Sequence, residues 1–180
     1  MTQEYIIKKK YCRKDLSGIL ALSIILTLGL LLLVYMKGPD SIRIGIPVFL
    51  FFLLIQIIPF LLLHDGYYDA NRSDSLLCDY ENKILTYCHG NEPPITLKAI
   101  DISRVKYYLS YAANNKNPGR FLWDRYSYCD IEIPNDKSLF ITSLLVPDIN
   151  FFLSNMNIDP KIIEKKPGFY SSITKSSSDW

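Results

Sequence analysis

The hydrophobic residues are concentrated in two uninterrupted runs near the N-terminus, residues 16–36 and 44–63, and neither run contains a charged side chain. A helix of about 20 residues, at a rise of about 1.5 Å per residue, matches the hydrocarbon core of a bilayer, which is about 30 Å thick. A buried helix of a soluble protein would be expected to show a polar face, and none is present here. The pattern therefore predicts a transmembrane hairpin with a short turn at residues 37–43.

A cleaved signal peptide is the alternative for the first run, because basic residues precede it. Its apolar part exceeds the usual ~7 to 15 residues, and no small-residue cleavage site follows at residues 35–38. In the second run, Pro59 predicts a kink or an early exit. Gln56 predicts a hydrogen bond to the first helix or between protomers, although a single amide in a bilayer is also tolerated. Small residues let helices approach closely, so the candidate helix contacts are Gly18, Ala21, Gly29 and Gln56.

The flanking charges predict the orientation of the hairpin. The N-terminal segment, residues 1–15, is rich in Lys and Arg, whereas the connecting loop has only Lys37 and Arg43. Basic flanks stay in the cytoplasm, so we expect a multi-pass protein of the inner (plasma) membrane with both termini cytoplasmic. The same residues could attract anionic lipid, although setting the topology is sufficient to explain them. They are Lys8, Lys9, Lys10, Arg13 and Lys14.

After residue 63, the apolar positions alternate with polar ones, which is typical of half-buried strands. Alternation is clear at residues 76–80, 105–111 and 126–133, with turn residues between the segments. Helical spacing returns only after Pro147 and Asp148. We therefore expect an α+β fold in which residues 64–158 form a small antiparallel barrel or sandwich closed by one C-terminal helix, followed by a flexible tail at residues 159–180.

This order of elements resembles the pleckstrin-homology-like (PH-like) domains of bacterial membrane proteins, in which a transmembrane hairpin precedes the strands. The resemblance rests on the arrangement, on the hairpin expected at residues 76–85, and on Leu139-Phe140-Ile141-Thr142 leading into the helix. It covers about residues 67–157. Phosphoinositide-binding members carry clustered Lys and Arg on the first hairpin, whereas this hairpin has Lys83 beside Asp79 and Glu81. Headgroup recognition of that type is therefore not expected.

Composition narrows the class of ligand. The formal net charge is +2 and the part after the second run has no dense basic patch, so nucleic-acid binding is not expected. The four cysteines lack CxxC spacing, which favours reduced thiols in the cytosol. A metal site would need four residues to converge, but without paired-ligand spacing the cysteines are better explained as small buried hydrophobes, and we expect no metal and no cofactor. The four residues are Cys78, Cys88, His89 and Cys129.

Catalytic chemistry has little support in the sequence. There is no nucleophile elbow, P-loop or HExxH pattern, so the chain is not expected to be an enzyme. A membrane-bound hydrolase that uses Asp124 and Asp130 as an acid and base pair is the remaining catalytic alternative.

Aromatic and basic residues gather after the polar loop at residues 114–119. Such residues anchor protein contacts and also collect at membrane interfaces, although Trp123 and Tyr126 could instead fill the core. The leading hypothesis is a non-enzymatic module at the inner leaflet that binds a protein partner or self-associates through this segment or a sheet edge. The alternative is an assembly subunit of a membrane complex that acts mainly through its helices. The candidate binding residues are Lys116, Arg120, Phe121, Trp123, Arg125, Tyr126 and Tyr128.

Overall fold

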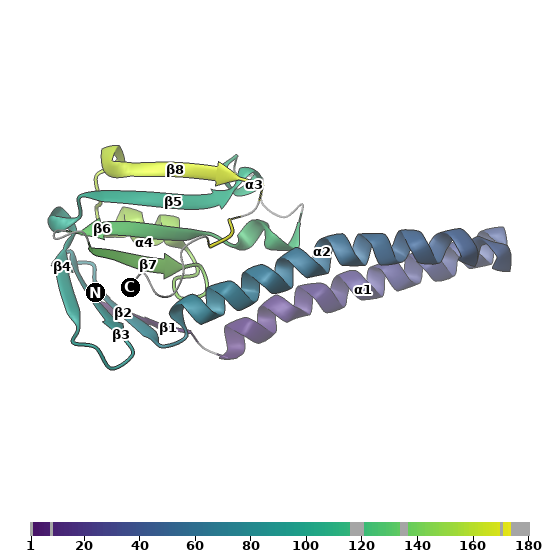
Figure 1. The fold of residues 1–180 in the computed structure, drawn as a ribbon, viewed down its shortest axis with the longest axis horizontal. Helices are drawn as coiled ribbons and strands as arrows, with labels where there is room; N and C mark the ends of the chain where they lie inside the picture. Colours follow the sequence, from purple (N-terminus) through teal and green to yellow (C-terminus); the bar gives the residue numbers. More distant parts are fainter. Residues whose placement is uncertain (1, 8, 116–120, 134–136, 170, 174–180) are drawn as a thin grey trace.

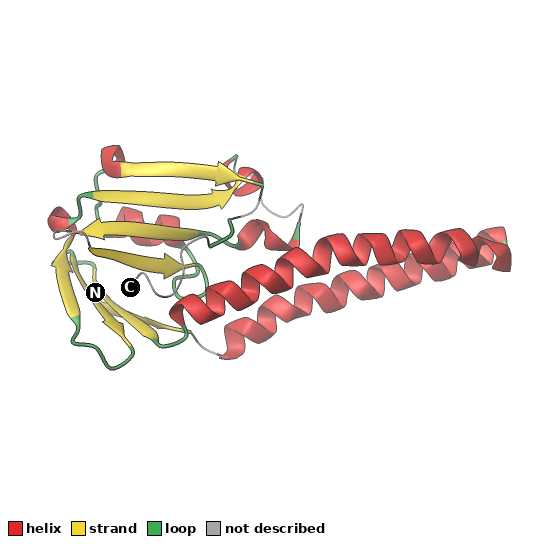
Figure 2. Ribbon diagram, in the orientation of Figure 1, coloured by secondary structure: helices red, strands yellow, loops and turns green. Residues whose placement is uncertain are grey.

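The computed structural model describes residues 2–7, 9–115, 121–133, 137–169 and 171–173. Figure 1 shows two β-sheets at one end of the molecule and a long pair of helices that extends away from them, and Figure 2 shows the same α+β division by secondary structure. The strands are β1 (Thr2–Ile6), β2 (Asp74–Asp79), β3 (Ile84–His89), β4 (Ile95–Lys98), β5 (Arg104–Ser110), β6 (Tyr128–Ile133), β7 (Lys137–Thr142) and β8 (Ile163–Gly168). The α-helices are α1 (Lys9–Lys37), α2 (Ile42–Asn71), α3 (Tyr111–Asn114) and α4 (Ile149–Asn155), and the 3-10 helices are η1 (Pro39–Ser41), η2 (Ala99–Asp101), η3 (Leu122–Arg125) and η4 (Pro160–Ile162).

The first sheet is antiparallel and has the order β1-β2-β3-β4. Its β2–β3 hairpin is the one expected at residues 76–85. The Asp79 carboxylate accepts hydrogen bonds from the backbone N–H groups of Glu81 and Asn82, which fixes the turn. Lys83 closes the turn at φ 57°, and its amine donates to the Asn155 carbonyl at the end of α4 (2.7 Å). Lys83 is the one Lys or Arg of the β2–β3 hairpin, and its amine is already engaged in a hydrogen bond within the protein.

The second sheet has the order β7-β6-β5-β8, and β8 is parallel to β5. Residues 163–168, expected to belong to a flexible tail, therefore form a strand in register with β5 (Val105 opposite Ile163). The antiparallel barrel is also wrong, because the two sheets remain separate and one of them is mixed. The sandwich alternative describes the fold better, since buried residues of both sheets meet in one core.

The helical hairpin is inserted between two neighbouring strands. Residues 2–6, expected to belong to a basic N-terminal segment, form β1, which pairs with β2 (Tyr5 opposite Leu76). The chain leaves β1 through α1 and returns through α2 into β2, and the two helices run side by side (Figure 1). The hairpin is therefore joined to one sheet at both of its ends.

The second helix is longer than expected. It continues through Pro47 and Pro59 to Asn71, so the helix does not end at Pro59, and residues 64–71, expected to begin the β-domain, are helical. Among the described residues, one helical segment, Pro39–Asn71, is long and apolar enough to cross a membrane. The apolar segment of α1 that is described, Ser23–Lys37, is shorter than this criterion requires. Of the two transmembrane helices expected from the sequence, length and composition therefore support the second, α2, among the described residues.

Two apolar clusters hold the domain together. The larger one fills the space between the sheets, and α4 adds Ile149, Phe152 and Leu153 to it, which confirms the helix expected near the C-terminus. The Asp148 side chain caps α4 by accepting from the Phe151 N–H (2.9 Å). The smaller cluster joins α2 to η3, β6 and β7. Through this second cluster, the base of the hairpin is packed into the domain.

Candidate functional site

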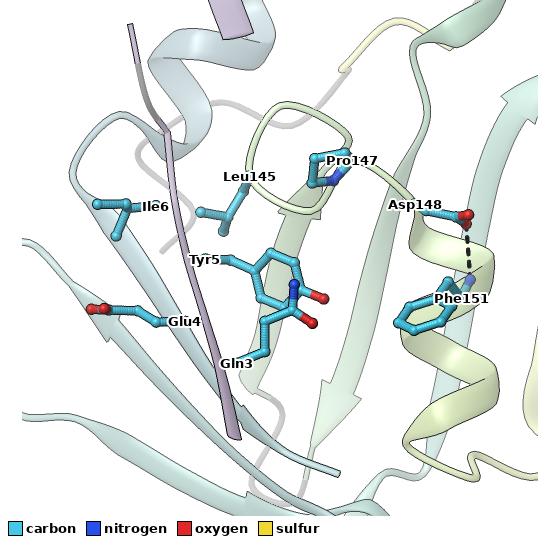
Figure 3. A pocket seen from close by; sticks show the side chains of 8 residues that line it. All are labelled: Gln3, Glu4, Tyr5, Ile6, Leu145, Pro147, Asp148 and Phe151. Atoms are coloured by element: carbon cyan, nitrogen blue, oxygen red, sulfur yellow. Dashed lines mark hydrogen bonds between the residues drawn. The ribbon is translucent and has the colours of Figure 1, made fainter. Parts of the chain in front are cut away.

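A groove of about 300 Å³ lies between β1 and the start of α4 (Figure 3). Strand β1 is the outer strand of its sheet, so the backbone groups on its open edge border this groove. Figure 3 shows Gln3 and Tyr5 on the groove side of the strand, and Glu4 and Ile6 on its other side. The groove is lined by Gln3, Glu4, Tyr5, Ile6, Leu145, Pro147, Asp148 and Phe151.

The floor of the groove is rigid. Tyr5 is buried, and its hydroxyl is hydrogen-bonded to the hydroxyl of Tyr80 (2.6 Å). Phe151 on α4 stands opposite and meets the Tyr80 ring edge-on, with 6.2 Å between the ring centroids. Because Phe151 is half-exposed, it offers an apolar contact beside the strand edge. Such an edge can pair with an extended peptide, while apolar side walls select its side chains.

The groove carries negative charge on both faces of β1. Asp148 and Glu4 are both exposed, Asp148 on the α4 side and Glu4 on the opposite face of the strand (Figure 3). An added strand would place alternate side chains on the two faces of the sheet. The charge pattern therefore favours a segment with Lys or Arg on either face.

A buried polar network ties the end of α2 to both sheets. The Asn71 side-chain amide donates to the Asp74 carboxylate (2.5 Å) and to the Phe140 carbonyl of β7 (2.8 Å). The Asp74 carboxylate also accepts from the Tyr87 hydroxyl (2.6 Å), and burial together with this carboxylate raises the pKa of Tyr87. His89 Nδ1 lies 2.6 Å from the same carboxylate. The network fixes the helix relative to the sheets, which is a structural role.

The aromatic residues expected to form a binding surface divide into two groups. Trp123, Tyr126 and Tyr128 are buried against α2 and β7, with Trp123 1% exposed, so the core explanation applies to these three. The Tyr126 hydroxyl is hydrogen-bonded to His64 Nδ1 (2.8 Å). These side chains pack at the junction between the domain and α2 and do not form an exposed binding surface.

The second group reaches the surface beside α2. Phe121 is half-buried and stacks on Trp123, with 4.5 Å between ring centroids, and Phe169 lies 5.8 Å from both rings. Arg125 is exposed, with its guanidinium carbon 5.9 Å from the centre of the Phe60 ring. Lys116 and Arg120 lie outside the described residues.

The comparisons with known proteins identify the family. A family model described as PH domain matches residues 4–152, which is most of the 180-residue chain. The chain belongs to the PH domain family. Neither the curated proteins nor the solved structures gave a significant match. The family match begins in β1 and ends in α4, so it includes the helical hairpin, which was expected to precede the domain. The resemblance to a PH-like domain is confirmed.

The PH domain also contacts the residue expected at mid-membrane depth. The Leu122 backbone N–H donates to Gln56 Oε1 (3.3 Å), so this amide contacts the domain. Ala21 and Gly29 lie on exposed parts of α1, and a Cβ on Gly29 would meet nothing within 4 Å. The close approach of the two helices is instead at Gly45, where a Cβ would lie 2.5 Å from the Leu30 side chain. The surroundings of Gly18 lie outside the described part of the chain.

The basic residues before the first run flank the PH domain on the hairpin side. Lys8 lies outside the described residues. The other members begin α1, where the chain leaves β1 and enters the hairpin. They are Lys9, Lys10, Arg13 and Lys14.

The residues considered for chemistry lie within the PH domain. The Asp124 carboxylate accepts from the Phe121 N–H (2.9 Å) and so fixes η3, while Asp130 is buried within β6. Cys78 and Cys129 are buried, and burial raises the pKa of the Cys78 thiol to about 12. Within the described ranges, no three His, Cys, Asp or Glu side chains come together as metal ligands.

Sequence reasoning missed the β1 groove because β1 is short. Thr2, Glu4 and Ile6 alternate with Gln3 and Tyr5, but five residues with one fully buried side chain are a weak strand signal. The alternation of Gln3 and Tyr5 with their neighbours was the one feature of the sequence that indicated a strand here.

Proposed function

We propose that this PH domain is a non-enzymatic interaction module, held at the cytoplasmic face of the plasma membrane by its inserted hairpin, that binds an extended basic segment of a protein partner along β1. The observation that carries the proposal is the continuity of β1 with α1. The strand that borders the groove leads directly into the anchor, so the groove is kept close to the membrane.

The exposed surface of the hairpin supports the anchor. Large apolar side chains point outward along both helices, among them Leu32, Phe51 and Leu62. A soluble protein rarely exposes a continuous apolar surface of this length. The neighbouring run at residues 16–36 is also free of charge, so we place α1 in the bilayer beside α2. The excess of Lys and Arg before the apolar run at residues 16–36 supports a cytoplasmic location for both termini.

The groove supports the choice of ligand. Its free strand edge suits main-chain hydrogen bonds, and Phe151 with the carboxylates of Glu4 and Asp148 suits a segment that alternates apolar and basic residues. Strand addition needs no rearrangement of the buried Tyr5 or of the half-buried Tyr80.

The experiment uses the full chain in lipid nanodiscs and a library of short peptides that alternate Lys or Arg with apolar residues. The best peptide should slow amide exchange in residues 2–6 and should bind several-fold more weakly to Phe151→Ala. Phe169→Ala, which also removes an exposed phenylalanine but far from the groove, should bind normally. A library that yields no binder, or a binder that protects other strands and leaves β1 unprotected, would contradict the assignment of the groove.

A second candidate function is assembly through the hairpin. It is favoured by Gly29, whose exposed position on α1 leaves room for the close approach of another helix. Gly29→Leu should then reduce the size of the assembly in mild detergent, whereas Leu32→Ile should preserve it. An unchanged mass for Gly29→Leu would exclude this contact.

A further inference from the structure

We infer that one edge of the PH domain, formed by Phe121, Arg125 and Phe169, is immersed in the interface of the inner leaflet. The inference rests on the proposed membrane hairpin and goes beyond it, because the domain itself then becomes a lipid-binding surface. We call these three residues the interface edge.

The depth at which the domain contacts α2 carries the inference. The apolar run of α2 extends to Leu63, but the domain already contacts the helix at Gln56 through Leu122. Seven residues of helix correspond to about 10 Å. The part of the domain around Leu122 therefore overlaps the last ~10 Å of the apolar run of α2.

The two sides of α2 have different surroundings at this level. Phe60 and Leu63 are buried against the domain, whereas Leu61 and Leu62 on the other side are 46% and 70% exposed. The first charged residue of α2 after Arg43 is Asp65. Leu62 lies at the same height along α2 as Phe60 and Leu63, which contact the domain on the opposite side of the helix. Lipid that covers Leu62 therefore also reaches this part of the domain.

The length of the free hairpin leads to the same conclusion. Between the turn at η1 and Gln56, α2 contributes residues 42–55, which correspond to about 21 Å of helix. A hydrocarbon core of about 30 Å could not be crossed by this part alone. The hairpin can span only if the bilayer extends past Gln56, and the interface edge then lies within it.

The side chains at this level suit the lipid interface. Phe169 is 60% exposed and packs on Phe121 and Trp123, so it forms an apolar projection supported by two rings. Arg125 lies beside Phe60, from where its long side chain can extend to lipid phosphate. Aromatic residues with a basic neighbour are typical of membrane interfaces. Through Phe121 and Trp123, the Phe169 ring also joins the apolar cluster that contains Phe60 of α2. Lipid is therefore favoured over a protein partner as its occupant.

Spin labels in the full chain, reconstituted in phosphatidylcholine and phosphatidylglycerol vesicles, test the depth. Single cysteines replace Phe51, Phe169 or Ile100 in a Cys12→Ser, Cys88→Ser background, in which the remaining cysteines are buried. The Ile100 position is 87% exposed and lies in η2, at the end of the domain away from the hairpin (Figure 1). Oxygen partitions into lipid and a charged nickel chelate stays in water, so their relative collision rates report depth. Arg125→Cys is a second reporter for the interface edge.

We expect the oxygen-to-nickel ratio to be high at position 51, lower but several-fold above the Ile100 value at positions 169 and 125, and lowest at position 100. Ratios at 169 and 125 equal to that at 100, with position 51 in lipid, would overturn immersion and leave the anchor intact. Shielding of 169 from both reagents would indicate a protein contact and would also overturn it. A water-exposed position 51 would contradict the anchor itself.

Discussion

The side chain of Asn71, the last residue of α2, donates to the carboxylate of Asp74, the first residue of β2, across 2.5 Å. The same amide donates to the Phe140 carbonyl, and its oxygen accepts from the Thr142 N–H (2.9 Å). Asn71 therefore links the helical hairpin to both sheets, and it is fully buried. A rigid connection of this kind keeps the β1 groove and the interface edge at fixed distances from the apolar helices.

Replacing Asn71 by Ala should destabilise the protein by about 3 kcal/mol, because it removes one of the hydrogen bonds to the buried Asp74 carboxylate and the side-chain partner of two backbone groups, the Phe140 carbonyl and the Thr142 N–H. Chemical unfolding of the full chain in detergent micelles measures the change. Asn91→Ala, at an exposed turn, is the matched control and should be close to neutral. A loss for Asn71→Ala no larger than that of the control would show that the network does not hold the helix.

Trp123→Ala should cost about 3 to 5 kcal/mol, because it removes a fully buried ring from the cluster that joins α2 to η3 and β7. Phe169→Ala removes an exposed ring from the same stack and should cost about 1 kcal/mol or less. Unfolding of the two variants under identical conditions gives the comparison. Equal losses would mean that Trp123 is not part of a packed core.

The thiols should react in the order of their exposure. Burial raises the pKa of Cys78 to about 12 and also raises that of Cys129, whereas Cys88 is partly exposed. Since the thiolate is the reactive form, a maleimide at neutral pH should modify Cys88 first and should reach Cys78 and Cys129 only after denaturation. Peptide mapping by mass spectrometry reads out each site. Rapid modification of Cys78 in the native protein would contradict its place in the core.

Docking of β8 should weaken in acid. Lys166, and next Arg104, hold the pKa of Glu164 below its ordinary value. A carboxylate with a lowered folded-state pKa stabilises the fold above its unfolded-state pKa, near 4.5, and this contribution is lost as the pH falls through the lowered value. Amide exchange in β8 relative to β6 should therefore rise at low pH.

Glu164→Gln should remove most of this pH dependence by making the exchange ratio high throughout, and Glu92→Gln, at an exposed turn, should leave it unchanged. A ratio that changes equally with pH in the wild type and in Glu164→Gln would assign the effect to other carboxylates.

Elements with a clear apolar period could be predicted from the sequence. Strands β2, β3 and β5 bury alternate side chains and helix α4 buries helically spaced ones, so their patterns are local. β1 and β8 bury few side chains and depend on the free edges of β2 and β5 for their hydrogen bonds. Such pairing is decided by distant residues, and a short window contains little trace of it.

The extension of α2 had a readable signal. Phe60, Leu63, Tyr67 and Asn71 recur at helical spacing, and all four are buried. The continuous hydrophobicity of residues 44–63 hid this stripe, because an apolar run shows no face until its neighbours are known. The same continuous run concealed the contact of Gln56 with Leu122, in which a residue of the apolar run meets a residue of the domain.

The proposal that the hairpin anchors the PH domain in the membrane is tested most directly by the sidedness of two single cysteines in the Cys12→Ser, Cys88→Ser background. Asp40→Cys lies in the turn between α1 and α2, and Glu92→Cys lies in the loop after β3. A membrane-impermeant maleimide should label Asp40→Cys in intact cells and should label Glu92→Cys only after permeabilisation. Labelling of both positions from outside, or of neither before permeabilisation, would contradict a spanning hairpin that holds the domain in the cytoplasm.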